Sequence, residues 1–344
     1  FSLSPDESCT VEVGFTPGDD DFAEFSAALF VENKDPNPTI ARALSGTFAE
    51  IQSINVAINQ VNACPRDPAR VFVSVTDGGG FPVTGLQPGD FTLAEDDGAG
   101  GGFGTEVQPA AADTIGSAPF DVSLSASLLM DYSGSIAGVD EFKANMEDAA
   151  KTLVNSMTAG DEAEVIKYSS NIEITQPFTE DVSLLLDAID RDPSVDGDTA
   201  LYDAVDLAVE NITERLKPRK AVIALTDGGD NVDNTTLQEA INAATTDDVP
   251  VITIGFGEVE IEDLQSLAAG TGGVFYNPPA SDNLDGTYQQ VANLLFKDQY
   301  VLTYGSGLPA EGGRVRVSAG FEKSTGEIVV LEGAAVKAVR ACQP

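Results

Sequence analysis

The hydrophobic period of this chain changes twice, and that change restricts its fold more than any other feature. Residues 50–120 alternate apolar and polar side chains with the strand period of two. Over residues 121–297, continuous apolar strands alternate with apolar stripes of helical spacing, and residues 307–344 return to period two. Buried apolar strands joined by helices are typical of a parallel, doubly wound sheet. We therefore expect an α/β domain at 121–297.

The β segments on either side of this domain share one style of sequence. Because the two ends of a domain often lie close together, a domain can be inserted into another with little disturbance. We therefore expect residues 50–120 and 298–344 to form one β-sandwich module into which the α/β domain is inserted, or which flanks it. Residues 1–49 also have the strand period, but they are too few to close a sandwich and read as a truncated β module.

From residue 121 onward the period predicts individual elements. Strands are expected at 121–130, 164–168, 171–175, 221–226, 250–256 and 300–304, and helices at 139–157, 200–216 and 282–296.

The charge of the chain excludes several classes of function. Its 344 residues contain 56 acidic and 18 basic side chains, a formal charge of −38, and no histidine. So negative a surface repels the phosphates of nucleic acids and of anionic membranes. Without histidine, the usual histidine-activated nucleophiles and His-ligated zinc are excluded, and we do not expect an enzyme. Self-repulsion of such a surface favours a monomer.

Clustered carboxylates also bind hard cations. The runs Asp19-Asp20-Asp21 and Glu95-Asp96-Asp97 offer oxygen ligands for Ca²⁺, although neither has the spacing of an EF-hand. A plain solvated surface is the alternative reading.

Three cysteines are too few for a disulfide scaffold. Cys64 and Cys342 lie near the two ends of the split β module, and a bridge between them is expected. The alternatives are that both are unpaired or that Cys9 takes one of them.

No apolar run is long enough to span a bilayer, and the chain starts abruptly at Phe1, so we expect it to be part of a longer exported protein.

Oxygen-bearing side chains follow the apolar strands of the α/β segment. Asp131, Ser133 and Ser135 come directly after the first strand, Thr199 lies in a later loop, and Asp227 ends the strand 221–226. In a doubly wound sheet, ligands collect at the carboxyl ends of the strands, where these residues would meet. Carboxylate and hydroxyl oxygens suit Mg²⁺ or Mn²⁺, which prefer six oxygen ligands. Any one of the five could merely cap a helix, but all five together favour a metal site.

These motifs resemble a known family. The D-x-S-x-S at 131–135, the G-x-T-A-L at 197–201 and the T-D-G at 226–228 resemble the complete metal-ion-dependent adhesion site of von Willebrand factor type A (vWA) domains. The resemblance covers residues 121–297 and implies a Rossmann-like fold. It also implies that Ser133, Ser135 and Thr199 bind the metal directly, and Asp131 and Asp227 directly or through water.

Two further resemblances concern the β segments. Residues 1–49, with "SLSPDESCTVEVGFTP", resemble the end of a Hydin-like, immunoglobulin-like repeat of long bacterial surface proteins. The sequence "VSVTDGGGFPVTGLQPGDFTLAEDDG" resembles the β-rich module that precedes vWA domains in bacterial exported proteins.

Together these resemblances imply an extracellular or cell-surface binding module. Its metal would complete its coordination with a carboxylate from a protein or glycan ligand. The alternative is a structural or assembly segment of a large extracellular protein, in which the metal only stabilises the fold.

Overall fold

The computed structural model describes residues 25–31, 40–46, 53–64, 68–193, 197–232, 234–256, 261–278, 284–324 and 328–342. The chain divides into two compact units, Phe1–Ile51 and Gln52–Pro344. In the first unit, β1 (Phe25–Val31) and β2 (Ile40–Gly46) pair in antiparallel register. The Hydin-like assignment of this unit stays a prediction, and Cys9 and Asp19-Asp20-Asp21 lie outside the described residues.

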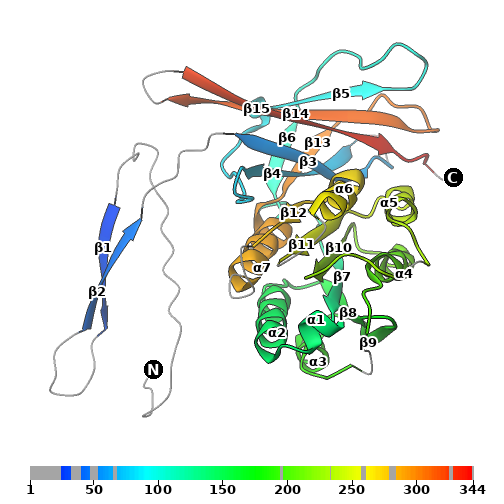
Figure 1. Ribbon diagram of the computed structural model, residues 1–344. Coiled ribbons are helices and arrows are strands. Elements are labelled where there is room, and N and C mark those ends of the chain that lie inside the picture. Colours follow the sequence, from blue (N-terminus) through cyan, green and yellow to red (C-terminus); the bar gives the residue numbers. More distant parts are fainter. Residues whose placement is uncertain are drawn as a thin grey trace. The chain divides into compact units, whose positions relative to one another are not determined.

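A six-stranded sheet forms the centre of the second unit (Figure 1). Its strand order is β12-β11-β10-β7-β8-β9. The strands are β7 (Leu124–Asp131), β8 (Glu162–Tyr168), β9 (Ile172–Thr179), β10 (Arg219–Thr226), β11 (Val251–Gly255) and β12 (Phe275–Tyr276). β7 is buried along its whole length, and β10 is buried except at Lys220, because helices cover both faces of the sheet.

The expectation of a wholly parallel sheet was wrong at one edge. All neighbouring strands from β12 to β8 are parallel, but β9 runs antiparallel to β8. Only residues 169–171 separate these two strands. A parallel neighbour requires a crossover of about a dozen residues or more, so a connection this short produces a hairpin.

Helices lie on both faces of the sheet. Side chains of α2, α3 and α7 form one core with β7, and those of α4, α5 and α6 form the core of the opposite face. The helices are α1 (Gly134–Ala137), α2 (Asp140–Asn155), α3 (Val182–Ile189), α4 (Leu201–Thr213), α5 (Leu237–Thr246), α6 (Ile261–Thr271) and α7 (Leu284–Asn293). The fold is therefore a three-layered α/β arrangement, as expected for a Rossmann-like domain.

Two antiparallel sheets lie beside this α/β layer (Figure 1). Their strands are β3 (Ile54–Asn62), β4 (Ala69–Asp77), β5 (Phe91–Asp96), β6 (Ala111–Thr114), β13 (Tyr300–Tyr304), β14 (Gly313–Ser324) and β15 (Ile328–Val339), and a short 3₁₀ turn, Pro88–Asp90, precedes β5. One sheet has the order β3-β4-β13-β6 and the other β15-β14-β5. The rings of Phe91 in β5 and Tyr300 in β13 lie 5.2 Å apart, so the two sheets share a core. Their immunoglobulin-like character stays a prediction.

The chain leaves and re-enters the four-stranded sheet at neighbouring positions. β6 precedes the α/β segment, and β13, which follows it after a π-helical turn at Leu294–Asp298, pairs with both β4 and β6. The backbone N–H of Ile115 donates to Gln299 O at 2.9 Å, and that of Gly116 donates to Lys297 O at 3.0 Å. These bonds join the two connections that lead into and out of the α/β segment.

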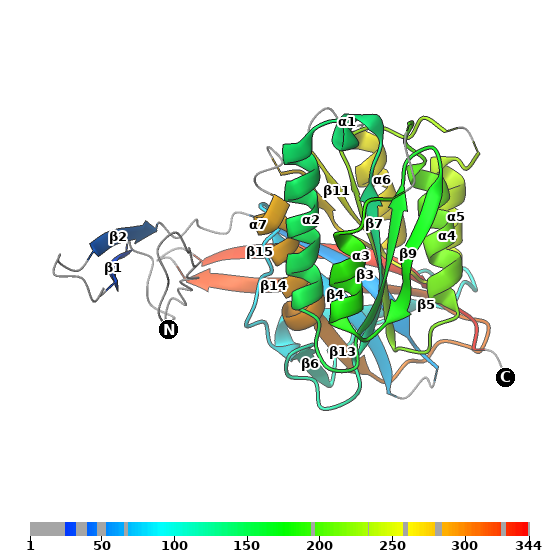
Figure 2. The same ribbon diagram turned by 90° about the horizontal axis from the view of Figure 1, so that it is seen from below.

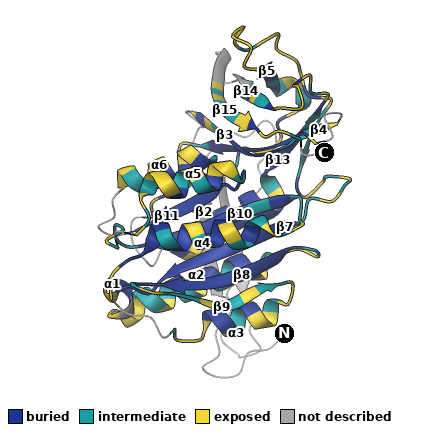
Figure 3. Cartoon of the chain, turned by 90° about the vertical axis from the view of Figure 1, so that its right-hand side faces the viewer, coloured by how far each residue is buried: buried dark blue, intermediate teal, exposed yellow. Residues whose placement is uncertain are grey.

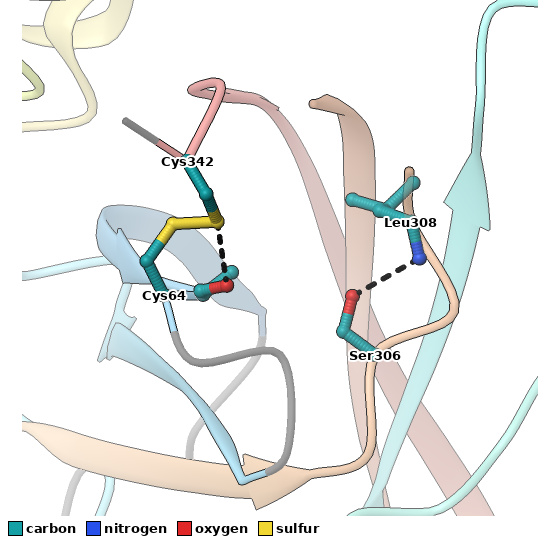
Figure 4. The surroundings of a disulfide bond; sticks show 5 residues. Cys64, Ser306, Leu308 and Cys342 are labelled. Atoms are coloured by element: carbon teal, nitrogen blue, oxygen red, sulfur yellow. Dashed lines mark hydrogen bonds between the residues drawn. A yellow bond between two sulfur atoms is a disulfide. The ribbon is translucent and has the colours of Figure 1, made fainter. Parts of the chain in front are cut away.

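A disulfide joins Cys64 and Cys342, the two cysteines that the sequence analysis paired (Figure 4). It connects the chain after β3 with the chain after β15, across 278 residues of sequence. The Cα atoms lie 5.6 Å apart, within the range that a disulfide requires. The Sγ of Cys342 lies 3.4 Å from Ala63 O. No helix in the described part of the chain is long and apolar enough to cross a membrane.

Buried carboxylates line the contact of β7 and β8 with α4. Glu164 accepts hydrogen bonds from Ser127 Oγ at 2.6 Å and Asn211 Nδ2 at 3.1 Å. Glu162, two residues earlier on the same strand, accepts hydrogen bonds from Ser125 and from the guanidinium of Arg215. Burial raises the pKa of Glu164 to about 7. Burial also works against the charge of Glu162, but the hydrogen bonds from Arg215 and Ser125 outweigh it and lower its pKa.

These opposite shifts predict opposite effects of two matched substitutions. A carboxyl with a raised pKa stabilises the fold below its unfolded pKa of 4.5, and this contribution is lost as the pH rises towards 7. We expect Glu164→Gln to be more stable than the wild type at pH 8 by up to about 3 kcal/mol, and the gain to vanish near pH 4.5. Glu162→Gln should instead be destabilised throughout pH 5–8, because it loses a charge that Arg215 stabilises. Melting temperatures across pH 4.5–8 test both; a Glu164→Gln gain that does not depend on pH would contradict the argument.

Candidate metal site

The candidate site lies where the strand order of the sheet reverses. β7 leads through α2 to β8 on one side, whereas β10, on its other side, leads to β11. Ligands of doubly wound sheets bind outside the carboxyl ends of the strands at such a switch point, because the connections diverge there. Asp131 is the last residue of β7, and Asp227 follows the last residue of β10. In Figure 2 this end of the sheet lies at the top, beside α1.

Four of the five residues predicted from the sequence are joined by hydrogen bonds. Ser133 N donates to Asp131 Oδ1 at 2.7 Å, and the hydroxyls of Ser133 and Ser135 lie 3.2 Å apart. Ser135 Oγ donates to Asp227 Oδ1 at 2.7 Å. The structure thus brings together Asp131, Ser133, Ser135 and Asp227 from two loops 92 residues apart in sequence.

Thr199 lies in a neighbouring loop rather than within this network. The carbonyl of Gly197 accepts a hydrogen bond from Gly134 N at 3.0 Å, which holds the loop against the D-x-S-x-S turn. Thr199 itself is buried; its N–H donates to Asn231 Oδ1 and its carbonyl accepts from Asn231 N. The loop that carries Thr199 is therefore adjacent to the D-x-S-x-S turn.

Two residues that support the site were not assigned a role from the sequence. Thr226 Oγ1 donates to Asp131 Oδ2 at 2.7 Å and so takes up the second oxygen of that carboxylate. Asn231 Oδ1 accepts a hydrogen bond from Thr199 N at 2.6 Å. Thr226 stands in the T-D-G motif, so the sequence did contain a signal that could have identified it as a residue of the site. Asn231 lies in an acidic loop that reads as ordinary solvated chain.

The electrostatics of the cluster suit a divalent cation. Asp131 is completely buried, and this burial raises its pKa to about 6, with the negative charge of Asp227 adding to the shift. Burial raises the pKa of Asp227 as well. Among the described residues, no lysine or arginine forms an ion pair or hydrogen bond with either carboxylate. A buried and a half-buried carboxylate side by side are unfavourable without a positive partner, and a cation that prefers oxygen ligands would neutralise their charge.

The cluster is open to solvent on one side. Ser135 is exposed and Asp227 half-buried, whereas Asp131 and Ser133 are buried. A cation held by the hydroxyls and carboxylates would therefore be reached from the side of Ser135. In the described residues no group of three or more Asp, Glu, Cys or His side chains has the spacing of a metal site, so this cluster of two carboxylates and hydroxyls is the candidate.

The acidic run Glu95-Asp96-Asp97 does not form a calcium site. Glu95 accepts hydrogen bonds from Tyr304, Ser306 and Gly307, while Asp96 pairs with Arg314 and Asp97 accepts from Ala99 N. Glu95 and Asp96, the last two residues of β5, point to opposite faces of the strand, and Asp97 follows the strand, so the three carboxylates are not gathered around one ion. The expectation of calcium at this run was wrong.

Comparison with known proteins gives the α/β segment a family. Residues 127–290 match the family described as von Willebrand factor type A domain. No curated protein sequence matches the chain.

Several solved structures resemble the fold only distantly. One is proximal thread matrix protein 1 from the mussel byssus with a zinc-occupied metal-ion-dependent adhesion site (MIDAS) motif. It is 24% identical over 51% of this chain and 48% of its own chain, with a TM-score of 0.46. This chain thus spans about half the length of that relative. A von Willebrand factor type A protein from Catenulispora acidiphila is 13% identical over 84% of this chain and 75% of its own, with a TM-score of 0.48. The vWF domain of the type V pili tip protein Mfa5 from Porphyromonas gingivalis is 12% identical over 51% of this chain and 96% of its own, with a TM-score of 0.41.

These TM-scores are below 0.5, and the likenesses carry no conclusion about function. The family assignment depends instead on the matched sequence and on the strand order around Asp131 and Asp227. Residues 127–290 of this chain are a von Willebrand factor type A domain.

Proposed function

We propose that this chain is a metal-dependent ligand-binding module whose site is the cluster of Asp131, Ser133, Ser135, Thr199 and Asp227. The family to which residues 127–290 belong typically mediates metal-dependent ligand binding or adhesion. The observation that carries the proposal is the pair of the buried Asp131 and the half-buried Asp227, which share a network of hydroxyls and have no cationic partner among the side chains that the structure describes.

Mg²⁺ or Mn²⁺ is the cation that fits this donor set. Both prefer small, hard oxygen ligands, and a site with few charged ligands leaves the metal electrophilic. When bound, the metal supplies a coordination position for a carboxylate of a protein or glycan ligand. Asp131 would hold the cation from the buried side, and the exposed side of the cluster, at Ser135, would be open to the partner.

The remaining properties follow from the same residues. The disulfide between Cys64 and Cys342 favours an oxidising, extracellular or cell-surface location. We propose a non-enzymatic role, since the chain contains no histidine and the site offers no general base besides its own metal ligands. The charge of −38 favours a monomer and disfavours nucleic acid as partner.

The experiment is a calorimetric titration of Mg²⁺ and of Mn²⁺ into protein stripped with EDTA. Asp227→Ala should lose the saturable site and keep its fold. Asp206→Ala is the matched control, because Asp206 is an exposed carboxylate of α4 and its loss reports only the loose attraction of cations to an acidic surface. A weak isotherm that is identical in all three proteins would exclude a specific site.

A structural or assembly role is the second candidate, and the bridged β sheets around the vWA domain favour it. In that case the metal would raise the melting temperature but the metal-loaded protein would bind no free carboxylate. Titration of acetate into Mg²⁺-loaded protein separates the two roles. A ligand-binding site with an open coordination position should bind acetate saturably, whereas a purely structural site should not.

A further inference from the structure

β8 contributes no side chain to the candidate metal site. Its last residue and the two serines that follow it nevertheless contact all three loops that carry the candidate ligands. The strand lies between β7 and β9, is buried at every residue, and is followed directly by Ser169 and Ser170 (Figure 3). Tyr168 is paired with Asp131 in the parallel register of β7 and β8. The end of β8 is therefore level with the site.

The first loop is held through the backbone of Tyr168. Tyr132 lies between Asp131 and Ser133, and its N–H donates to Tyr168 O at 2.7 Å. This bond continues the pairing of β7 with β8 by one residue into the D-x-S-x-S turn. It thereby sets where the turn begins.

The second loop is held on both sides of Thr199. Ala200 N donates to Ser169 O at 2.9 Å, and Asp198 N donates to Ser170 Oγ at 2.7 Å. Gly197, at the start of this loop, has a φ of +113°, and a Cβ there would lie 2.6 Å from Ser170 Oγ. Only glycine therefore lets the loop approach Ser170 this closely.

The third loop is held by the side chain of Tyr168. Its hydroxyl donates to Leu225 O at 2.7 Å, two residues before Asp227. The ring is completely buried in the core on the side of α4, so it has little freedom to follow a displaced loop.

We propose that Tyr168 and Ser170 are positioning residues of the metal site, which place the three ligand-bearing loops relative to one another without touching the metal. This inference rests on the proposed function. The loops come from β7, from the segment before α4 and from β10. Tyr168, the last residue of β8, hydrogen-bonds to the first and third, and Ser169 and Ser170, which follow it, hydrogen-bond to the second. Mg²⁺ requires near-ideal octahedral geometry, so small displacements of a loop weaken its binding.

Isosteric variants separate this role from general stability. Tyr168→Phe removes one hydroxyl and Ser170→Ala removes another, and neither is a metal ligand. Tyr300→Phe is the matched control, because the buried hydroxyl of Tyr300 donates to Val83 O at 2.9 Å, within the β sheets. The readouts are the Kd for Mg²⁺ from calorimetry and the melting temperature in EDTA, both measured on the full chain.

We expect Tyr168→Phe and Ser170→Ala each to weaken Mg²⁺ binding about tenfold, the lower end of the effect of residues that support metal ligands. Tyr300→Phe should lower the melting temperature in EDTA at least as much as Tyr168→Phe, because the Tyr300 hydroxyl also accepts from Leu86 N at 3.0 Å, while leaving the Kd unchanged. A Kd within twofold of the wild type in both variants, or an equal loss in Tyr300→Phe, would overturn the positioning role. If the wild type shows no Mg²⁺ site that depends on Asp227, the proposed function itself fails, and this inference fails with it.

Discussion

Asp131→Asn is expected to abolish the stabilisation of this protein by Mg²⁺ while leaving the metal-free fold at least as stable as the wild type. At a Mg²⁺ concentration of 100 times the Kd, binding to the folded state alone stabilises the wild type by about 2.7 kcal/mol. The amide of asparagine lacks the charge that attracts the cation, so this gain should disappear. We expect the affinity to fall by more than about a hundredfold, beyond the range for residues that only support ligands.

The metal-free protein should respond in the opposite sense. Asp131 and Asp227 are two carboxylates that no lysine or arginine of the described residues pairs with, and removing the charge of Asp131 relieves the cost of burying it. Asparagine can still accept from Ser133 N, and its amide can donate to Thr226 Oγ1, so the local hydrogen bonds are kept. Thermal denaturation in EDTA and in Mg²⁺ measures both effects. A large loss of melting temperature in EDTA would show that the carboxylate is needed for folding rather than for the metal.

Asp206→Asn provides the comparison for both measurements. This side chain is exposed on α4, and it lies outside the hydrogen-bonded cluster. Its substitution changes the net charge by the same amount as Asp131→Asn. Its Mg²⁺-dependent rise in melting temperature should equal that of the wild type.

Removing the disulfide is expected to destabilise the second unit by about 5 kcal/mol in the chain-entropy estimate for so long a loop. The bridge closes 278 residues, which include the whole vWA domain and most of the flanking strands. For domains of this size the loss corresponds to a fall of roughly 10 °C in melting temperature. The double variant Cys64→Ser, Cys342→Ser avoids leaving a free thiol, and its melting temperature is the measurement.

Reducing agent supplies the control for this prediction. Dithiothreitol should lower the melting temperature of the wild type towards that of the double variant and should have no effect on the double variant itself. The Mg²⁺ affinity of the folded double variant should be unchanged, since the bridge joins the ends of the β segments and not the loops of the site. A fall of less than about 2 °C would mean that the unfolded chain gains little freedom when the bridge is absent.

Local sequence was enough to predict the central strands, the helices α2, α4 and α7, and the residues of the candidate site, but it did not predict the helices α3, α5 and α6. Continuous apolar strands such as β7 and β10 are recognisable because burial on both faces leaves no polar alternation. The D-x-S-x-S spacing places Asp131, Ser133 and Ser135 in one turn, and a turn is a local structure. The family match over residues 127–290 confirms the vWA assignment, whereas metal binding and the domain boundaries stay predictions.

Features that depend on which strands are neighbours could not be predicted in this way. The hydrogen bond of Thr226 to Asp131 requires β10 to lie beside β7, although 95 residues separate the two side chains. The support of all three loops by Tyr168 and Ser170 likewise depends on strand order and register. Period and motif describe each segment by itself, and they contain no information about its neighbours.

The acidic runs illustrate the same division. By sequence, Glu95-Asp96-Asp97 and the pair Asp131 and Asp227 are all candidates for binding a cation. In the fold, Asp96 finds Arg314 on the neighbouring strand, whereas Asp131 and Asp227 meet each other and two serine hydroxyls. The sequence by itself determined the central strands, most of the longer helices and the chemical types at their ends. Only the tertiary structure decided which carboxylates are neutralised within the protein and which have no cationic partner among the described residues, because that depends on the side chains that distant strands bring to them.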